Sequence, residues 1–194
     1  MWQCLYAAAV RCCVSFVSQR DPLRSSIKGK GGSQMRILSI DVGTRNFAMS
    51  VYCTDAKEFV LFALKDFIKI KDCVATMRKF TLEEPFISAD IILVENQMRS
   101  MMRTMATSIR AFHFEKTKMI APQSVKRWFN TCMKKHGSNK KVAVALARKL
   151  LNAKNLAQLE KFKKKDDISD CVIQTYYYLE KFKPTRCPEG IRKV

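Results

Sequence analysis

Closely spaced apolar segments in the first half of the chain predict strands. Three of them, at 36–41, 47–53 and 58–64, are separated only by short polar connections. Connections this short are typical of antiparallel neighbours, so the pattern predicts a three-stranded meander. The nearly continuous aliphatic run at 89–97 indicates a further strand that is buried on both faces, as in a sheet covered by helices.

Apolar residues at helical spacing predict helices between and after these strands. A helix at 68–81 takes its apolar face from Val74, Met77 and Phe80. In the segment 98–114, methionines recur at i, i+3, i+4 and i+7, which is typical of a helix face packed in a core. These methionines are Met98, Met101, Met102 and Met105.

The second half of the chain continues this alternation of elements. A short strand at 118–121 is stopped by Pro122, and a helix follows it. The segment 137–141 is interpreted as a loop leading into another helix. The apolar face of that helix consists of Val142, Leu146, Leu150 and Leu151. A final helix opens within 163–170 and continues to Leu179.

A single carboxylate stands at the end of the first predicted strand, in Ile40-Asp41-Val42-Gly43. Asp is disfavoured inside strands, so its position asks for a reason. Gly43 permits a sharp turn directly after it. Asp41 either caps its own loop, as Asp does in many turns, or belongs to a functional site mounted on a rigid strand end. This motif alone leaves both interpretations open.

The charge of the chain points to an anionic polymer as its partner. There are 36 Lys and Arg against 17 Asp and Glu, a formal net charge of +19. Such a field attracts nucleic acid in the usual case, or an anionic membrane surface. The excess is local, because the segment 116–165 contains fifteen Lys or Arg and a single acid, Glu160. No apolar run reaches the ~18 residues of a membrane span, so we expect a soluble protein.

The length of 194 residues suits one well-buried domain. We predict that domain at 35–183, between an N-terminal extension, 1–34, and a basic tail, 184–194. The extension is basic, poor in acids and apolar at its start, which suits an organelle-targeting peptide or a dispensable segment preceding Met35. The eight cysteines lack CxxC pairs and metal-ligand spacing, which predicts reduced thiols in an intracellular protein.

Further acids accompany Asp41. Glu95 lies near the end of the aliphatic run, and Asp167 and Asp170 are three residues apart in the first turn of the last predicted helix. Acids at helix N-termini are common and stabilising, which is the simple explanation of that pair. Four converging carboxylates would instead need divalent cations to offset their repulsion. Two such ions support phosphodiester hydrolysis, so acids within a basic chain indicate a metal-dependent nuclease.

Taken in order, these motifs resemble the RuvC family of Holliday junction resolvases. The resemblance lies in Ile40–Asn46, Val94–Gln97 and Lys165–Asp170, and it covers about residues 35–180. It is strongest to the branch in poxviruses and other large DNA viruses, and next to the fungal mitochondrial branch. It implies an α/β, RNase H-like fold with a five-stranded mixed sheet, its first three strands antiparallel, and helices on both faces.

The resemblance also implies roles for individual residues. The expected ligands of two Mg²⁺ or Mn²⁺ ions are Asp41, Glu95, Asp167 and Asp170. Lys126 matches a lysine near the scissile phosphate, whereas Asp166 is a less suitable ligand because the last two acids of the family are three residues apart. Lys140 or Lys141 matches a second basic position of the family. Apart from the resemblance, the basic composition adds further expected DNA contacts, and the full set is Arg45, Arg99, Arg103, Lys126, Arg127, Lys140 and Lys141. For Arg99 and Arg103, a solvated helix face is the alternative.

By the same resemblance the protein would be a homodimer that cuts a four-way DNA junction by paired symmetric nicks, without a membrane or a small-molecule substrate. It would act at a viral replication site, or in the mitochondrion if residues 1–34 are an import signal. Two alternatives stay open. One is another RNase H-like enzyme, such as a ribonuclease H or an integrase. The other is a non-catalytic nucleic-acid-binding protein whose acids only cap turns.

Overall fold

The computed structural model describes residues 34–130 and 139–182. By its internal contacts the chain divides after Gly32, and the second unit, Ser33–Val194, contains all of the described residues. The predictions made for 1–33, for the first two residues of the loop at 137–141 and for the tail at 184–194 lie outside them. Residues 139–141 belong to the helix Asn139–Leu150, so the predicted loop was wrong for these three residues. None of the described helices has the length and apolar character needed to cross a lipid bilayer.

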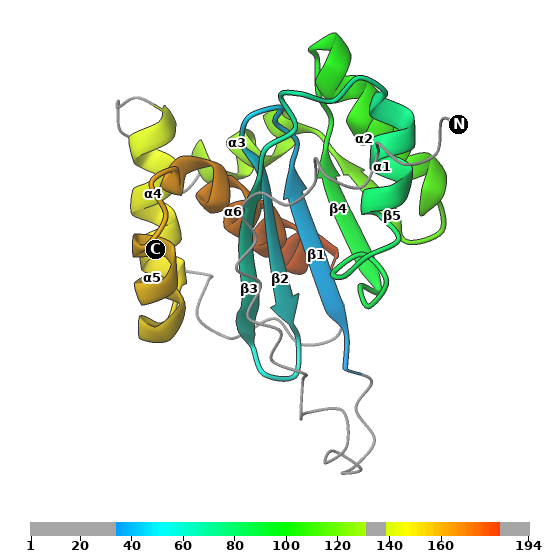
Figure 1. Cartoon of the computed structure of the whole chain (residues 1–194). Coiled ribbons are helices and arrows are strands. Elements are labelled where there is room, and N and C mark those ends of the chain that lie inside the picture. Colours follow the sequence, from blue (N-terminus) through cyan, green and yellow to red (C-terminus); the bar gives the residue numbers. More distant parts are fainter. Residues whose placement is uncertain (1–33, 131–138, 183–194) are drawn as a thin grey trace, which may run out of the picture. The chain divides into compact units, whose positions relative to one another are not determined.

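Five strands form one mixed sheet in the order β3-β2-β1-β4-β5 (Figure 1). The strands are β1 (Arg36–Asp41), β2 (Phe47–Cys53), β3 (Glu58–Lys65), β4 (Ile91–Glu95) and β5 (Thr117–Ile120). β2 pairs antiparallel with both β1 and β3, whereas β4 runs parallel to β1 and to β5. The predicted antiparallel meander and the mixed five-stranded sheet are therefore confirmed.

Helices cover both faces of this sheet (Figure 1). They are α1 (Cys73–Phe80), α2 (Ser100–Phe112), α3 (Pro122–Asn130), α4 (Asn139–Leu150), α5 (Ala153–Glu160) and α6 (Lys165–Phe182). On one face, Leu38 and Ile40 pack with Met105 of α2. On the other face, Ile37 and Leu93 pack with Val172 of α6 and its neighbours. The core thus lies in two layers, one on each side of the sheet.

The first helix is shorter than its apolar pattern suggests. Asp72 caps its N-terminus, because the Asp72 carboxylate accepts a hydrogen bond from the backbone N–H of Ala75 at 3.0 Å. The predicted helix at 68–81 therefore starts only at Cys73. Met77 is fully buried, but Val74 is 49% exposed, so its assignment to the buried face was wrong.

The methionine stripe is only partly core. The helix begins at Ser100, so Met98 falls in the preceding loop and is 84% exposed. Met105 is fully buried and Met102 packs partly against the same cluster, whereas Met101 lies at the exposed border of the helix. The expectation that all four methionines face the core fails because the helix boundary, and not the spacing alone, decides which residues share a face.

Aromatic residues of α3 and α6 pack into the core, and one helix, α5, was not predicted. The three tyrosines 176–178 of α6 are buried, and Trp128 packs edge-on against Tyr177. Pro122, expected only to stop a strand, also begins α3, where its missing N–H has no helical partner to lose. The helix α5 was not predicted. The residue that could have indicated this helix is Asn152, because Asn is a common N-cap residue. The Asn152 side chain accepts a hydrogen bond from Asn155 N at 2.8 Å and so caps the helix.

Cys53, Cys73 and Cys171 are free thiols, and these are the cysteines that fall within the described ranges. The other cysteines lie outside the residues that the structure describes.

Candidate active site

Asp41 and Glu95 end two adjacent parallel strands on the same face of the sheet. Successive strand residues point to opposite faces, and Ile37 and Leu93 face α6 while Ile40 and Val94 face α1 and α2. Alternation therefore directs Asp41 and Glu95 toward α6. Ile40 of β1 pairs with Val94 of β4, so the two acids follow directly from paired positions.

Gly43 allows the chain to turn away immediately after Asp41. A Cβ atom added at Gly43 would lie only 2.4 Å from the carbonyl oxygen of Asn46. This close approach of backbone to backbone leaves no room for any side chain. A hydrogen bond from Phe67 N to Thr44 O, at 2.7 Å, holds this turn to the segment that follows β3. The Asp41 side chain at this strand end is half-buried.

The first turns of α6 bring the remaining acids to these strand ends. Ile168 and Cys171 are fully buried against the sheet, which fixes the N-terminal part of the helix. Asp167 directly precedes Ile168, and Asp170 directly precedes Cys171. The structure therefore brings together the four carboxylates that the sequence singled out, and they do not lie on separate sides of the domain.

The carboxylates are close enough to raise the pKa values of one another. Burial raises the pKa of Asp41 well above its ordinary value. Neighbouring charges raise it further, in the order Glu95, Asp170, Asp167 and Asp166. Asp166, which the sequence interpretation set aside as a ligand, therefore contributes to the electrostatics of the site. Without a cation, the ionised form of Asp41 is disfavoured.

The pKa values of Asp170 and Glu95 are raised as well. Desolvation, followed by the charges of Glu95, Asp167 and Asp166, raises the pKa of Asp170 to about 7. Desolvation also raises the pKa of Glu95. Lys126 of α3 opposes both shifts, so its positive charge lies near this group of acids. Asp170 keeps exposed surface, and water there reduces the energetic cost of its shift.

The donor set suits a hard divalent cation, although the side chains do not already enclose one. Within residues 34–130 and 139–182, no three His, Cys, Asp or Glu side chains are arranged to hold a metal ion. The acids nevertheless share one strand-end region and carry only oxygen ligands, which Mg²⁺ and Mn²⁺ prefer. A cation would also remove the repulsion that raises their pKa values.

Cys171 lies beneath Asp41 but does not supply a nucleophile. The residue is fully buried in the core. Burial, and then the negative charge of Asp41, raises the pKa of its thiol well above the ordinary value. A thiol held neutral in this way is unreactive.

The residues expected to contact DNA come from several elements, and among them the charge of Lys126 acts on Glu95 and Asp170. Arg45 follows β1, Arg99 precedes α2, Lys126 and Arg127 belong to α3, and Lys141 to α4; all five are exposed. Lys140 lies in α4, but its side chain is not among those described. Arg103 is also exposed, and one of its guanidinium nitrogens donates to Met98 O at 2.8 Å. One donor of Arg103 is therefore engaged by the loop before α2 and is not available to DNA.

Sequence interpretation assigned no role to Gln97. Its side-chain Nε2 donates a hydrogen bond to Asp41 Oδ1 at 3.3 Å. The signal available in the sequence was its place two residues after Glu95, within the Val94–Gln97 motif. The contact itself depends on the pairing of β1 with β4, which the local sequence does not specify.

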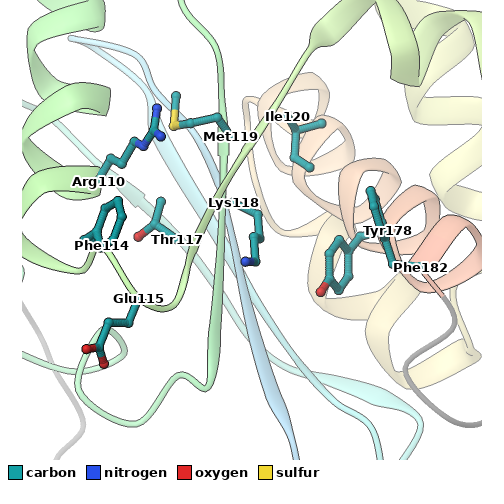
Figure 2. Close-up of a pocket in the computed structure, with 9 residues that line it drawn as sticks. All are labelled: Arg110, Phe114, Glu115, Thr117, Lys118, Met119, Ile120, Tyr178 and Phe182. Atoms are coloured by element: carbon teal, nitrogen blue, oxygen red, sulfur yellow. The ribbon is translucent and has the colours of Figure 1, made fainter.

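A hollow beside β5 is separate from the acids. It has a volume of about 650 Å³ and lies along β5, with Arg110 and Phe114 on one side and Tyr178 and Phe182 on the other (Figure 2). Tyr178 and Phe182 belong to the C-terminal end of α6, whereas Asp167 and Asp170 lie at its N-terminal end. The hollow is therefore not part of the carboxylate site.

Three solved structures share this architecture. Fowlpox virus resolvase in complex with Holliday junction DNA is 22% identical, with a TM-score of 0.55 over 76% of this chain and 99% of its own. The yeast mitochondrial Holliday junction resolvase Ydc2 is 16% identical, with a TM-score of 0.55 over 73% of this chain and 78% of its own. Thermus thermophilus RuvC with a Holliday junction substrate is 13% identical, with a TM-score of 0.54 over 75% and 95%.

At these identities the likeness establishes the shared, RNase H-like fold, and it confirms the fold that the sequence motifs implied. No curated protein matches the chain in sequence. The model of the Poxvirus A22 protein family matches residues 35–181. Since that match spans most of the 194 residues, the chain belongs to the Poxvirus A22 protein family, the poxvirus Holliday junction resolvases.

Proposed function

We propose that this protein is a metal-dependent endonuclease that resolves four-way DNA junctions by paired symmetric nicks. The observation that carries the proposal is the convergence of Asp41 and Glu95, at adjacent strand ends, with the acids of α6. Family membership supports the same activity, since Holliday junction resolvases hydrolyse DNA phosphodiester bonds.

We propose Asp41, Glu95, Asp167 and Asp170 as the ligands of two Mg²⁺ or Mn²⁺ ions. Metal dependence is general to the family, whereas the ion and the number of ions are our inference. When bound, such ions activate water and stabilise the leaving oxygen of the phosphodiester. The chain itself supplies the oxygen donors, on two rigid strand ends and one helix.

Lys126 is proposed to hold the scissile phosphate beside these acids. It is exposed, and its charge acts on both Glu95 and Asp170. A lysine ammonium binds a phosphate as a point charge and offsets negative charge that develops during cleavage. The surrounding exposed basic residues, among them Arg45, Arg127 and Lys141, would hold the DNA backbone.

The proposal is tested by removing one acid at a time while leaving the basic surface intact. Asp41→Asn and Glu95→Gln should abolish junction cleavage in Mg²⁺, because each removes a proposed metal ligand. Junction binding in EDTA should stay as tight as in the unsubstituted protein, or become tighter, because fewer negative charges face the phosphates. Cleavage by either variant at an undiminished rate would rule out this assignment of the metal site.

Substrate selectivity separates the proposal from its two alternatives. A four-way junction, a linear duplex and an RNA–DNA hybrid are compared in Mg²⁺, and the junction should be cut into nicked duplexes that ligase can seal. Preferential cutting of the hybrid would indicate a ribonuclease H. The absence of cleavage of every substrate, together with no effect of metal on thermal stability, would indicate a non-catalytic binding protein.

We also propose that the protein acts as a homodimer. A four-way junction offers two symmetric cleavage sites, which a two-fold symmetric enzyme matches. Light scattering of the purified protein, alone and with the junction, should give the mass of two chains in both states. The proposed place of action is a viral replication site within the host cell, or the mitochondrion if residues 1–34 are an import signal.

A further inference from the structure

The loop that joins β4 to α2 is held in place at both of its ends. Asn96 N donates to Ile120 O at 2.8 Å, which extends the pairing of β4 with β5 beyond Glu95. Two residues later, Met98 O accepts a hydrogen bond from the Arg103 guanidinium at 2.8 Å. The backbone on either side of Gln97 is therefore held by hydrogen bonds, which sets the direction of the Gln97 Cα–Cβ bond.

That direction leads to Asp41. Gln97 Nε2 donates to Asp41 Oδ1 at 3.3 Å, and Gln97 itself is half-buried. A carboxylate at the end of its side chain can rotate about its last bond, and a hydrogen bond to one oxygen selects one orientation. The donor is an uncharged amide. It can orient Asp41 and leave intact the negative charge that a cation requires. A lysine or arginine donor would instead neutralise that charge.

We propose that Gln97 is a positioning residue that presets the Asp41 carboxylate for a divalent cation. The inference rests on the proposed function, since it assumes that Asp41 binds a metal ion. By this arrangement Asp41 Oδ1 receives the amide hydrogen bond, while the carboxylate is kept in one orientation toward Glu95 and α6. Residues that orient metal ligands typically change metal affinity by ~10–100-fold when they are substituted.

The direct test measures Mn²⁺ binding to the full chain in the absence of DNA, by titration calorimetry and electron paramagnetic resonance. Gln97→Met keeps the length of the side chain and removes the amide, and it should weaken Mn²⁺ binding by ~10-fold or more. Gln97→Asn keeps an amide that is too short to reach Asp41, and it should weaken binding to a similar extent. Because Gln97→Asn is a small polar change at a half-buried position, it decides the question if Gln97→Met does not fold.

Kinetics supply a second measure that a purely structural role would not change. The Mn²⁺ concentration for half-maximal junction cleavage should rise in both variants, while the rate at saturating Mn²⁺ recovers most of its value. Asn96→Leu is the matched control. It removes the neighbouring amide, which is exposed, and it should leave both the binding and the cleavage curves unchanged.

The outcomes distinguish this inference from the function on which it rests. If the unsubstituted protein binds no Mn²⁺, the proposed metal site itself is wrong. If Asp41→Asn abolishes Mn²⁺ binding while both Gln97 variants bind Mn²⁺ as the unsubstituted protein does, only the role of Gln97 is overturned. Equal melting temperatures of the Gln97 variants and the unsubstituted protein in EDTA would show that the comparison concerns the site and not the stability of the fold.

Discussion

Asp41 occupies a position that is costly without a cation. It is half-buried at the end of a strand whose four inner residues are buried, and the charged groups that shift its pKa are other carboxylates. Lys126 acts on Glu95 and Asp170, and it does not remove the rise in their pKa values. A cluster of acids that remains destabilised in its ionised form is a typical feature of metal and catalytic sites.

These raised pKa values predict how the stability of the metal-free protein changes with pH. The pKa of Asp170 is about 7 in the folded protein, against an ordinary value of 3.8. Between these values the folded state holds a proton that the unfolded state has released. The stabilisation from this group is thus fully present below pH 3.8 and is lost as the pH rises through about 7.

Thermal melts in EDTA should therefore show a melting temperature that falls between about pH 5 and about pH 8. Mg²⁺ or Mn²⁺ at the upper end of this range should restore it, because a cation binds the ionised, folded form. Asp170→Asn should flatten the dependence, and this comparison separates the acids from His113, whose pKa is lowered by burial. A profile for Asp170→Asn that matches the unsubstituted protein would contradict the prediction.

At the scale of elements, the helix α5 covers one edge of the sheet. The edge strand β3 is covered by α5 through Asn155, which is 1% exposed. Its side chain accepts a hydrogen bond from Phe59 N at 3.1 Å and donates one to Phe59 O at 2.6 Å. One amide thus satisfies both backbone groups of a strand residue as a neighbouring strand would, which also protects the edge from pairing with another chain.

Asn155→Ala should lower the free energy of unfolding by about 1–3 kcal/mol, because it leaves two backbone groups of Phe59 without their partner in a buried place. Urea denaturation measures this change. Lys154→Ala is the control on the same helix, since the Lys154–Glu58 ion pair at 3.0 Å is exposed on the lysine side and should contribute at most about 1 kcal/mol. Equal losses in the two variants would refute the bridging role of Asn155.

At the scale of the whole molecule, the surplus of positive charge dominates encounters with DNA. The net charge of +19 is concentrated in the segment 116–165, which contributes α3 and α4 to the side of the sheet that α6 covers. The exposed basic residues of these helices include Lys126, Arg127 and Lys141. Binding through them should release counterions from the DNA and weaken steeply with salt.

Junction binding by the inactive Asp41→Asn protein should therefore fall linearly in a plot of log affinity against log salt. Arg127→Ala and Lys141→Ala should each weaken binding and reduce that slope by about 1, as expected for the loss of one phosphate contact. Lys154→Ala should leave the slope unchanged, because Lys154 pairs with Glu58 beside β3. Equal slopes for all of these proteins would show that Arg127 and Lys141 do not contact the backbone.

Much of the fold was predictable because its signals are local. The strands β1, β2 and β3 are marked by apolar runs with short connections, and the start of α6 by its acids. The failures concern boundaries and partners: Asp72 shortens α1, the start of α2 at Ser100 leaves Met98 exposed, and α5 lacks a strong periodic signal. Capping and tertiary packing decide these features, and they outweigh helical spacing alone.

The sequence by itself determined which side chains are available: four acids in three separated motifs, a basic second half, and a glycine where the backbone must approach itself. It could not determine that Ile40 pairs with Val94, which sets Asp41 and Glu95 side by side, or that Gln97 reaches Asp41. The reason is physical. Side-chain chemistry is a property of each residue, whereas distances between residues that are far apart along the chain exist only after the sheet has paired and α6 has packed against it.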